Sequence, residues 1–161
     1  MTKPRRIPDS IWRWMKHLNQ RLVRNYRSKA RMGRLVLLLI TTGRKSGLPR
    51  TTPLQYEEIE GVYYVGSARG RQADWFRNLQ ANPCVHVQVR ERQFDTQAEL
   101  ITDPGRIADF LEYRLERHPR MIGAMLRMEG LPRDFSRAEL EQFAAEKTLV
   151  ALRPISTDPQ P

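Results

Sequence analysis

The segment LVLLLITTGRKSGLPRTTPL, residues 35–54, decides the fold of this chain. It opens with an unbroken apolar run over residues 35–42, which Gly43 closes and which predicts a fully buried strand. A loop with two glycines and one proline follows, and then a second strand that carries Pro53. Because proline lacks the N–H that a strand ladder needs, Pro53 predicts an edge or a bulge, where a ligand could lie against the sheet.

The rest of the chain continues with strand patterns and three helix patterns. Residues 85–89 alternate Val with polar residues, which is the period-two pattern of a half-buried strand. Further strands are predicted over residues 51–57, 62–67, 93–102 and 148–152, with turns at 58–61 and 91–92. Helices are predicted over residues 74–81, from Asp103-Pro104 to a break near His118-Pro119, and after a capping box of Ser136 and Glu139. About six strands with few crossover helices predict an α+β fold built on a small, mostly antiparallel barrel.

The composition limits the class of protein. The 161 residues are enough for one domain, expected over residues 1–153 and followed by a frayed tail over residues 154–161. One Cys argues against a disulfide scaffold, and three scattered His show no metal-ligand spacing, so no metal is expected. No apolar run is long enough to span a bilayer and no secretory signal is recognisable, so a cytoplasmic protein is expected.

The positive charge is concentrated in the first third of the chain. The net charge is +10, but residues 1–50 carry fourteen Lys or Arg and one acidic residue, whereas the remainder is slightly acidic. Residues 10–27 have the pattern of an amphipathic basic helix. Such a helix could dock on the barrel with a solvated charged face, bind the anionic tail of a cofactor, or lie on a membrane surface. The surplus of cations favours an anionic partner.

The loop of the deciding segment has the residues of a phosphate site. Arg44, Lys45 and Arg50 supply cations, Ser46 supplies a hydroxyl, and the glycines let backbone amides approach a ligand. An ordinary basic hairpin has the same composition, so the loop alone leaves both interpretations open. A second cluster at residues 66–70, followed by the predicted helix, offers further amides, a hydroxyl and an arginine.

Together, GRKSGLPRTTPL (residues 43–54) and DWFRNLQANP (residues 74–83) resemble the deazaflavin-dependent nitroreductase family. The resemblance covers residues 35–89 and extends loosely to residue 153. It implies a split β-barrel of the flavin/deazaflavin oxidoreductases and coenzyme F420, a deazaflavin with a phosphate and a polyglutamate tail. The loop before Trp75 is shorter than in the best-known nitroreductase branch and lacks its His-Pro, so the substrate range of that branch is not implied.

The resemblance also implies the residues of a cofactor site. Near the phosphate and the proximal tail it places Arg44, Lys45, Ser46, Gly47, Arg50 and Thr51. Along the deazaflavin ring it places Pro53, Leu54 and Gln55, with Ser67, Ala68 and Arg69 closing the other side. Trp75 and Asn78 are expected to buttress the loop.

The implied activity is hydride transfer from reduced F420 to a small organic acceptor, such as a quinone, a nitroaromatic or a conjugated enone. No side chain is required as a nucleophile or base, and the completing proton could come from solvent, Ser67 or a tyrosine. The candidate tyrosines are Tyr56, Tyr63, Tyr64 and Tyr113. Residues 113–135 are expected to roof the acceptor pocket. The methionines of that segment, which could equally be core, are Met121, Met125 and Met128.

Two other classes of protein fit the same residues. One is a barrel that binds flavin mononucleotide or haem. The other is a nucleic-acid-binding module that uses the basic first third, although no nucleic-acid-binding motif is recognisable and no nucleic acid is expected as a partner. Contact with an anionic membrane and a homodimer are both compatible with the reductase hypothesis.

Overall fold

The computed structural model describes residues 36–66 and 70–155. The basic helix expected at residues 10–27 lies outside the described residues, as do Ser67, Ala68 and Arg69. The end of the expected tail, residues 156–161, lies outside them too.

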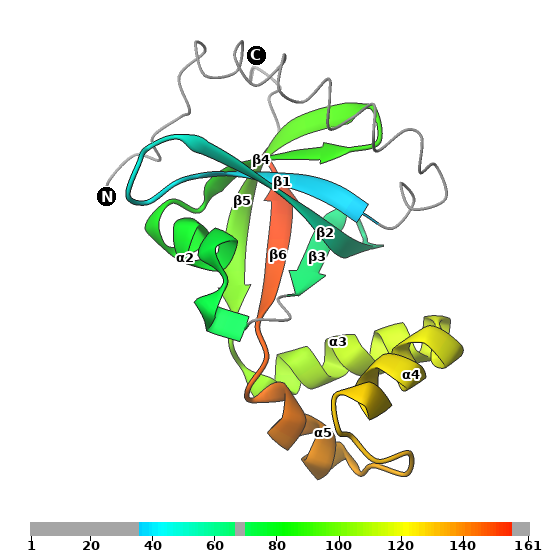
Figure 1. Ribbon diagram of the computed structural model, residues 1–161. Coiled ribbons are helices and arrows are strands. Elements are labelled where there is room, and N and C mark those ends of the chain that lie inside the picture. The colour runs from blue at the N-terminus through cyan, green and yellow to red at the C-terminus, as the bar shows by residue number, and fades with distance from the viewer. Residues whose placement is uncertain (1–35, 67–69, 156–161) are drawn as a thin grey trace.

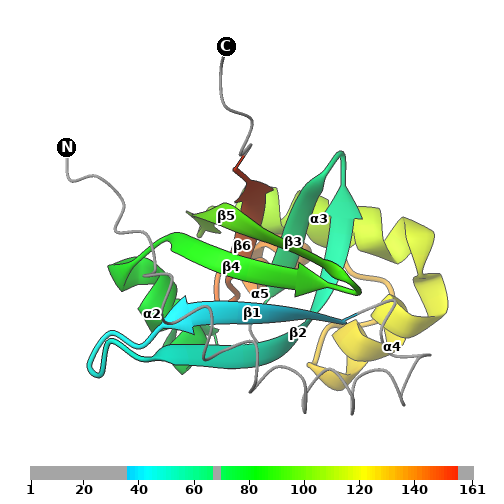
Figure 2. The ribbon, with the colours of Figure 1, turned by 90° about the horizontal axis from the view of Figure 1, so that it is seen from above.

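Six strands form a closed barrel in the order β1-β2-β3-β6-β5-β4. Their bounds are β1 Val36–Thr42, β2 Pro49–Ile59, β3 Val62–Gly66, β4 Cys84–Val89, β5 Arg92–Ile101 and β6 Leu149–Pro154. Every neighbouring pair is antiparallel. Figures 1 and 2 show β1 between β2 and β4. The α+β barrel predicted from the strand pattern is therefore confirmed.

The two predicted hairpin turns differ from the structure in their bounds. The β2–β3 turn is tighter than expected and consists of Glu60 and Gly61 alone, because Ile59 already pairs with Val62. Both turn residues have positive φ, 51° and 78°, as a two-residue hairpin of the favoured twist requires. The β4–β5 turn keeps the expected length but lies one residue earlier, at Arg90 and Glu91, because Val89 pairs with Arg92; Arg90 has a φ of 55°. Predictions of turn residues 58–61 and 91–92 were wrong in their bounds because backbone twist, not composition, sets where pairing stops.

The barrel has an edge along the first half of β2. Residues 49–55 pair with β1, whereas only residues 56–59 pair with β3. Pro53 lies in the first part, opposite Leu38 of β1, and its other side meets no strand among the described residues. The edge predicted from Pro53 is thus present, and a residue without an N–H suits it.

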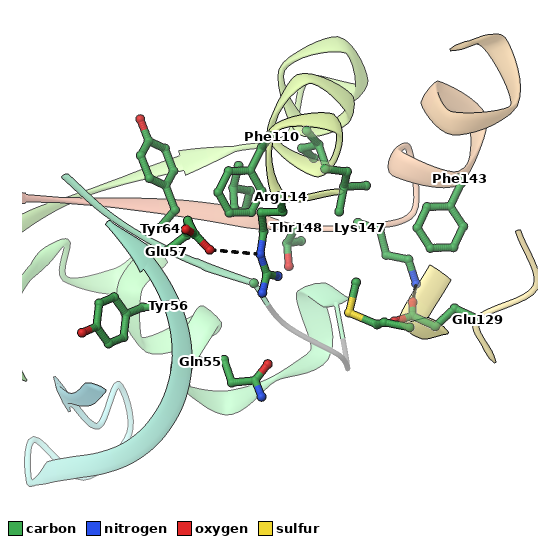
Figure 3. A pocket seen from close by; sticks show the side chains of 15 residues that line it. Gln55, Tyr56, Glu57, Tyr64, Phe110, Arg114, Glu129, Phe143, Lys147 and Thr148 are labelled. Carbon is green, nitrogen blue, oxygen red and sulfur yellow. Dashed lines mark hydrogen bonds and ion pairs between the residues drawn. The ribbon is translucent and has the colours of Figure 1, made fainter. Parts of the chain in front are cut away.

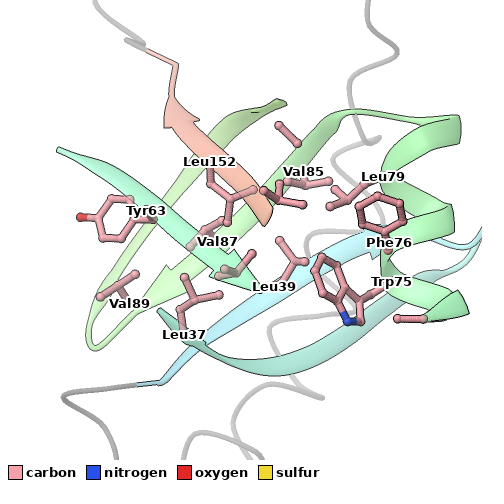
Figure 4. Packing of buried hydrophobic residues seen from close by; sticks show 14 residues of the cluster. Leu37, Leu39, Tyr63, Trp75, Phe76, Leu79, Val85, Val87, Val89 and Leu152 are labelled. Carbon is pink, nitrogen blue, oxygen red and sulfur yellow. The ribbon is translucent and has the colours of Figure 1, made fainter. Parts of the chain in front are cut away.

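Two apolar cores hold the molecule together. One fills the barrel, where side chains of all six strands meet Trp75, Phe76 and Leu79 (Figure 4). The other lies between the helices and the outer side of the barrel, around Ile107, Ile122 and Leu140. Because alternate residues of a strand point to opposite faces, β6 serves both cores, with Val150 facing the barrel interior and Ala151 facing the helices.

The helices occupy two places around the barrel. The 3-10 turn η1 (Gly70–Gln72) and α2 (Asp74–Ala81) lie at one end, beside β1 and the loop that follows it (Figure 1). The helices α3 (Pro104–Arg117), α4 (Pro119–Met128) and α5 (Arg137–Ala144) form a separate group below the barrel. Within the described residues, none of these helices is long and apolar enough to cross a membrane.

The ends of the helices follow the predicted signals. Asp103 caps α3 by accepting from the backbone amides of residues 105 and 106, and Ser136 and Glu139 form the capping box of α5. The helical conformation is interrupted between α3 and α4 at His118, before Pro119. The last strand runs further than expected, through Pro154, so the tail begins later than residue 154.

Candidate functional site

The loop that joins β1 to β2 has a compact hydrogen-bonded shape. Gly43 N donates to Leu48 O at 2.7 Å, and Gly47 N donates to Gly43 O at 2.7 Å. A Cβ on Gly43 would lie 2.6 Å from Ser46 Oγ and 3.1 Å from Leu48 O, so a side chain there would displace the Ser46 hydroxyl and crowd the turn. Gly47 has a φ of 68°, which side chains disfavour. The two glycines are thus needed for different reasons, and together they set the path of the loop.

This loop is anchored on α2 through Asn78. The Asn78 side chain is 4% exposed, and its Oδ1 accepts from both Arg44 N and Arg44 Nη1 at 3.1 Å. Its Nδ2 donates to Thr41 Oγ1 at 3.1 Å. Arg44 also pairs with Asp74 at 3.1 Å. Asn78 and Arg44 thus hold the β1–β2 loop to α2.

The remaining cations and hydroxyl of the loop face solvent. Lys45, Ser46 and Arg50 are all exposed, and they lie on one short hairpin at the same end of the barrel as α2. This donor set suits a phosphate or a carboxylate. Trp75 differs, because it is buried in the barrel core, edge-on to Phe76 with ring centroids 6.0 Å apart.

A row of side chains connects the loop to a cavity. Leu54 and Tyr56 of β2 pack toward the barrel core. The alternation of a strand puts Pro53, Gln55 and Glu57 on the other face. Pro53 and Gln55 are exposed, whereas the side chain of Glu57 is only 11% exposed. The row therefore begins at the basic hairpin, follows the open edge of β2, and ends beneath α3.

The cavity lies where the row ends, between the outer face of the barrel and the helices (Figure 3). Its volume is about 200 Å³. The barrel contributes Gln55, Tyr56, Glu57, Tyr64, Gly66 and Leu149. The helices and the segment before β6 contribute Ile107, Phe110, Leu111, Arg114, Met125, Glu129, Phe143, Lys147 and Thr148. Gln55 belongs both to the cavity and to the residues expected along the deazaflavin ring, so the two regions adjoin.

Charged groups form the wall of the cavity beside β2. Glu57 lies 3.5 Å from Arg114 Nε, 3.6 Å from Arg117 Nε and 3.6 Å from His118 Nε2. Burial lowers the pKa of Arg114, and the nearby Glu57 opposes this shift. At the other wall Lys147 pairs with Glu129 and lies over the Phe143 ring, 4.4 Å from its centroid.

Two buried polar atoms of the cavity lack hydrogen-bond partners within the described residues, Arg114 Nε and Thr148 Oγ1. The contact of Arg114 Nε with Glu57 is an ion pair without hydrogen-bond geometry. Thr148 is 4% exposed, and it stands next to Leu149, which pairs with Gly66 of β3. Buried polar groups in proteins are nearly always hydrogen-bonded, so such atoms in a cavity wall point to a ligand or a water.

The tyrosines and methionines named from the sequence separate into two groups. Tyr56, Tyr64 and Met125 line the cavity. Tyr63 is buried in the barrel core, where desolvation raises the pKa of its hydroxyl. Outside the cavity lining are also Tyr113, whose hydroxyl accepts from Arg117, and the exposed Met121 and Met128. Of the expected roof, α4 thus contributes Met125.

Sequence reasoning missed Glu57, Arg114 and Thr148. Glu57 continues the period of two that starts at Pro53, and this signal was available. Arg114 follows Ile107 and Leu111 at helical spacing, so an arginine on the apolar stripe of α3 was a second signal. Thr148 carries no pattern of its own, because its burial depends on how the segment before β6 packs against the helices.

Comparisons with known proteins identify the family of the chain. The family model described as F420H(2)-dependent quinone reductase matches residues 12–120. An F420H(2)-dependent quinone reductase of Mycobacterium tuberculosis is 39% identical over 66 residues, which are 39% of this chain and 44% of that protein. The chain thus spans less than half the length of the curated relative it matches.

Solved structures share the barrel. The F420-H2 dependent reductase FDR-A has a TM-score of 0.51 and 24% identity, over 74% of this chain and 95% of that one. The haem storage protein HutZ from Vibrio cholerae has a TM-score of 0.51 and 20% identity, over 83% of this chain and 88% of that one. These likenesses show the fold alone, since one barrel can carry different functions. The family model, by contrast, matches well over half of the sequence, and the chain belongs to the F420H(2)-dependent quinone reductase family.

Proposed function

We propose that this protein reduces a quinone-type acceptor with a hydride supplied by reduced coenzyme F420. One observation carries the proposal: the open edge of β2 begins at the basic hairpin and leads to the cavity, and Gln55 lies both on that edge and in the cavity lining. An anionic redox cofactor and a small acceptor would meet at that residue.

The residues present suit the cofactor. Lys45 and Arg50 would bind the phosphate and the first carboxylates of the tail, with Ser46 and the amide of Gly47 as further donors. Arg44 would act mainly by holding the loop, since it is already bonded to Asn78 and Asp74. Thr51 would lie beside the phosphate. Pro53, Leu54 and Gln55 would border the ring from β2, and Ser67, Ala68 and Arg69 would border it from the segment after β3. Trp75 would support this arrangement from the barrel core.

When bound, the reduced deazaflavin supplies the hydride, and the protein orients it and limits the access of water. The cavity wall would position the acceptor beside Gln55 and Gly66. Tyr64 is the tyrosine of the lining that packs on the helix-facing side of the barrel, and it is thus the candidate to deliver the completing proton. Nitroaromatics and conjugated enones are secondary acceptors in this proposal.

Cofactor titration tests the proposal directly. F420 should bind with a change in its fluorescence, and flavin mononucleotide should bind more weakly because it carries fewer negative charges. Lys45→Ala and Arg50→Ala should each weaken F420 binding about tenfold, the size of a charge-assisted hydrogen bond. Arg90→Asn is the matched control, because it removes one positive charge at the β4–β5 turn, away from the hairpin, and Asn tolerates positive φ.

We also expect the protein to accelerate the oxidation of reduced F420 by a quinone. The proposal fails if F420 does not bind, or if Arg90→Asn weakens F420 binding as much as Lys45→Ala does. A homodimer and contact with an anionic membrane stay predictions, since the basic segment on which membrane contact depends lies outside the described residues.

A further inference from the structure

The cavity contains a polar site that the cofactor does not need. We propose that Thr148 Oγ1 and Arg114 Nε are the hydrogen-bond donors that hold a carbonyl oxygen of the acceptor. The inference rests on the proposed function for the identity of the ligand as an acceptor, but the site itself rests on the geometry of the cavity.

The first observation is the unmet hydrogen-bonding capacity of these two atoms. Both are buried, and neither has a hydrogen-bond partner among the described residues. A buried hydroxyl or guanidinium N–H without a partner destabilises the protein that contains it. Thr148 and Arg114 both line one cavity, so a single ligand that enters it lies beside both side chains.

The second observation is the chemistry of the two donors. An arginine N–H can only donate, and a threonine hydroxyl can donate as well as accept. An acceptor atom without hydrogens, such as a carbonyl oxygen, therefore satisfies both. Glu57 beside Arg114 makes a second anion costly at this wall, so the site favours a neutral carbonyl over a carboxylate.

The third observation is the shape of the cavity. An apolar cavity of about 150 Å³ is known to hold benzene, so the space of about 200 Å³ accommodates a single ring. Phe110, Leu111 and Met125 provide apolar walls for the faces of such a ring. Thr148 is followed by Leu149, the partner of Gly66, so the oxygen would be held close to the strand ends that border the expected cofactor ring.

The removal of the hydroxyl tests the proposal. Thr148→Val keeps the shape of the side chain and removes its donor, whereas Thr148→Ser keeps the donor. The probe is duroquinone, a single-ring quinone that is fully substituted and so does not add to the free Cys84. Calorimetry on the full chain should give a dissociation constant about tenfold higher for Thr148→Val, and nearly unchanged for Thr148→Ser. Xylene, a ring without carbonyls, should bind Thr148→Val as well as it binds the wild type.

The melting temperature distinguishes a binding role of Thr148 from a structural one, because a structural role predicts that Thr148→Val lowers it. Because the hydroxyl lacks a partner, Thr148→Val should melt at the same temperature as the ligand-free wild type or higher. The matched control is Thr96→Val, since the Thr96 hydroxyl is also buried but donates to Val85 O at 3.3 Å. That variant should melt at a lower temperature and bind duroquinone normally. Arg114→Lys should weaken duroquinone binding too, because it keeps the charge beside Glu57 and removes the Nε–H.

The proposal is overturned if the wild type does not bind duroquinone, or if Thr148→Val binds it as tightly as the wild type. It is also overturned if Thr148→Val weakens the binding of F420 as much as the binding of duroquinone, because the hydroxyl would then bind the cofactor. Failure of the wild type to bind F420 would instead refute the proposed function, while the comparison of duroquinone with xylene would still decide the role of Thr148.

Discussion

At the scale of the residue, Asn78 determines whether the basic hairpin keeps its shape. Its amide group bonds Arg44 and Thr41, two residues of different segments, from a nearly fully buried position. We expect Asn78→Ala to lower the free energy of unfolding by about 2–3 kcal/mol, because it removes the three hydrogen bonds of a buried amide, one of them to the buried Thr41 hydroxyl. F420 binding should weaken as well, since the loop loses its anchor. Urea denaturation and cofactor titration measure the two effects.

Asp74→Ala is the control for this prediction. It removes only an ion pair with Arg44, and the Asp74 side chain is 84% exposed. Such surface pairs contribute less than about 1 kcal/mol. If Asp74→Ala destabilises the protein as much as Asn78→Ala does, the ion pair and not the buried amide is what holds the hairpin.

His86 on β4 makes the stability of the folded protein depend on pH. Burial lowers the pKa of His86 below its usual value, although Asp95, with its Oδ1 2.9 Å from His86 Nδ1, opposes this. The unfolded chain therefore binds the proton more tightly than the folded protein. Stability is complete above the unfolded pKa, near 6.5, and is lost as the pH falls from there through the folded pKa. Urea unfolding at neutral pH and about two units lower should show a smaller loss in His86→Gln than in the wild type. An unchanged loss would assign the effect to other groups.

At the scale of the element, Arg137 joins α5 to α3. Its guanidinium contacts Asp109 and Glu112 of α3 at 2.7 Å and Glu141 of α5 at 2.8 Å. Because this contact needs the planar fork of arginine, Arg137→Lys should lower the melting temperature despite keeping the charge. Acceptor binding should weaken too, since both helices line the cavity. Arg120→Lys, an exposed change on α4, should alter neither. A melting temperature of Arg137→Lys equal to that of the wild type would contradict this role.

Elements were easier to predict than the site because their signals are local. The helix at residues 74–81, the helix start with Pro104 at its first position and the Ser136–Glu139 capping box depend on neighbours in sequence, and the structure has all three. The sequence also narrowed Pro53 to an edge or a bulge, because its missing N–H excludes a position paired on both sides, and the structure has the edge. The pair of Glu57 with Arg114 was not, since it forms only when α3 packs on the outer face of β2. The turn bounds were missed because two of the turn residues with positive φ are Glu60 and Arg90, and neither residue type signals that conformation in a sequence.

At the scale of the whole molecule, the distribution of charge links cofactor binding to the length of the cofactor's anionic tail. Residues 1–50 hold the whole positive surplus, since the remainder of the chain is slightly acidic, and the hairpin at the end of this segment exposes Lys45 and Arg50. A phosphate near the hairpin accounts for two or three of these cations, so the rest are available to the carboxylates of a longer anionic tail. Attraction between exposed charges is screened by salt, because the Debye length falls from about 10 Å at 0.1 M to about 3 Å at 1 M.

The salt dependence of cofactor binding should therefore increase with the length of the tail. Between about 0.05 M and about 0.5 M salt, we expect the affinity for F420 with its glutamates to fall more than about tenfold, and the affinity for F420 without them to fall about threefold or less. Fluorescence titration of both forms measures the two slopes, and Arg90→Asn should leave both unchanged. Parallel slopes would mean that the glutamates stay in solvent, in which case the positive surplus of the first fifty residues serves a different anion.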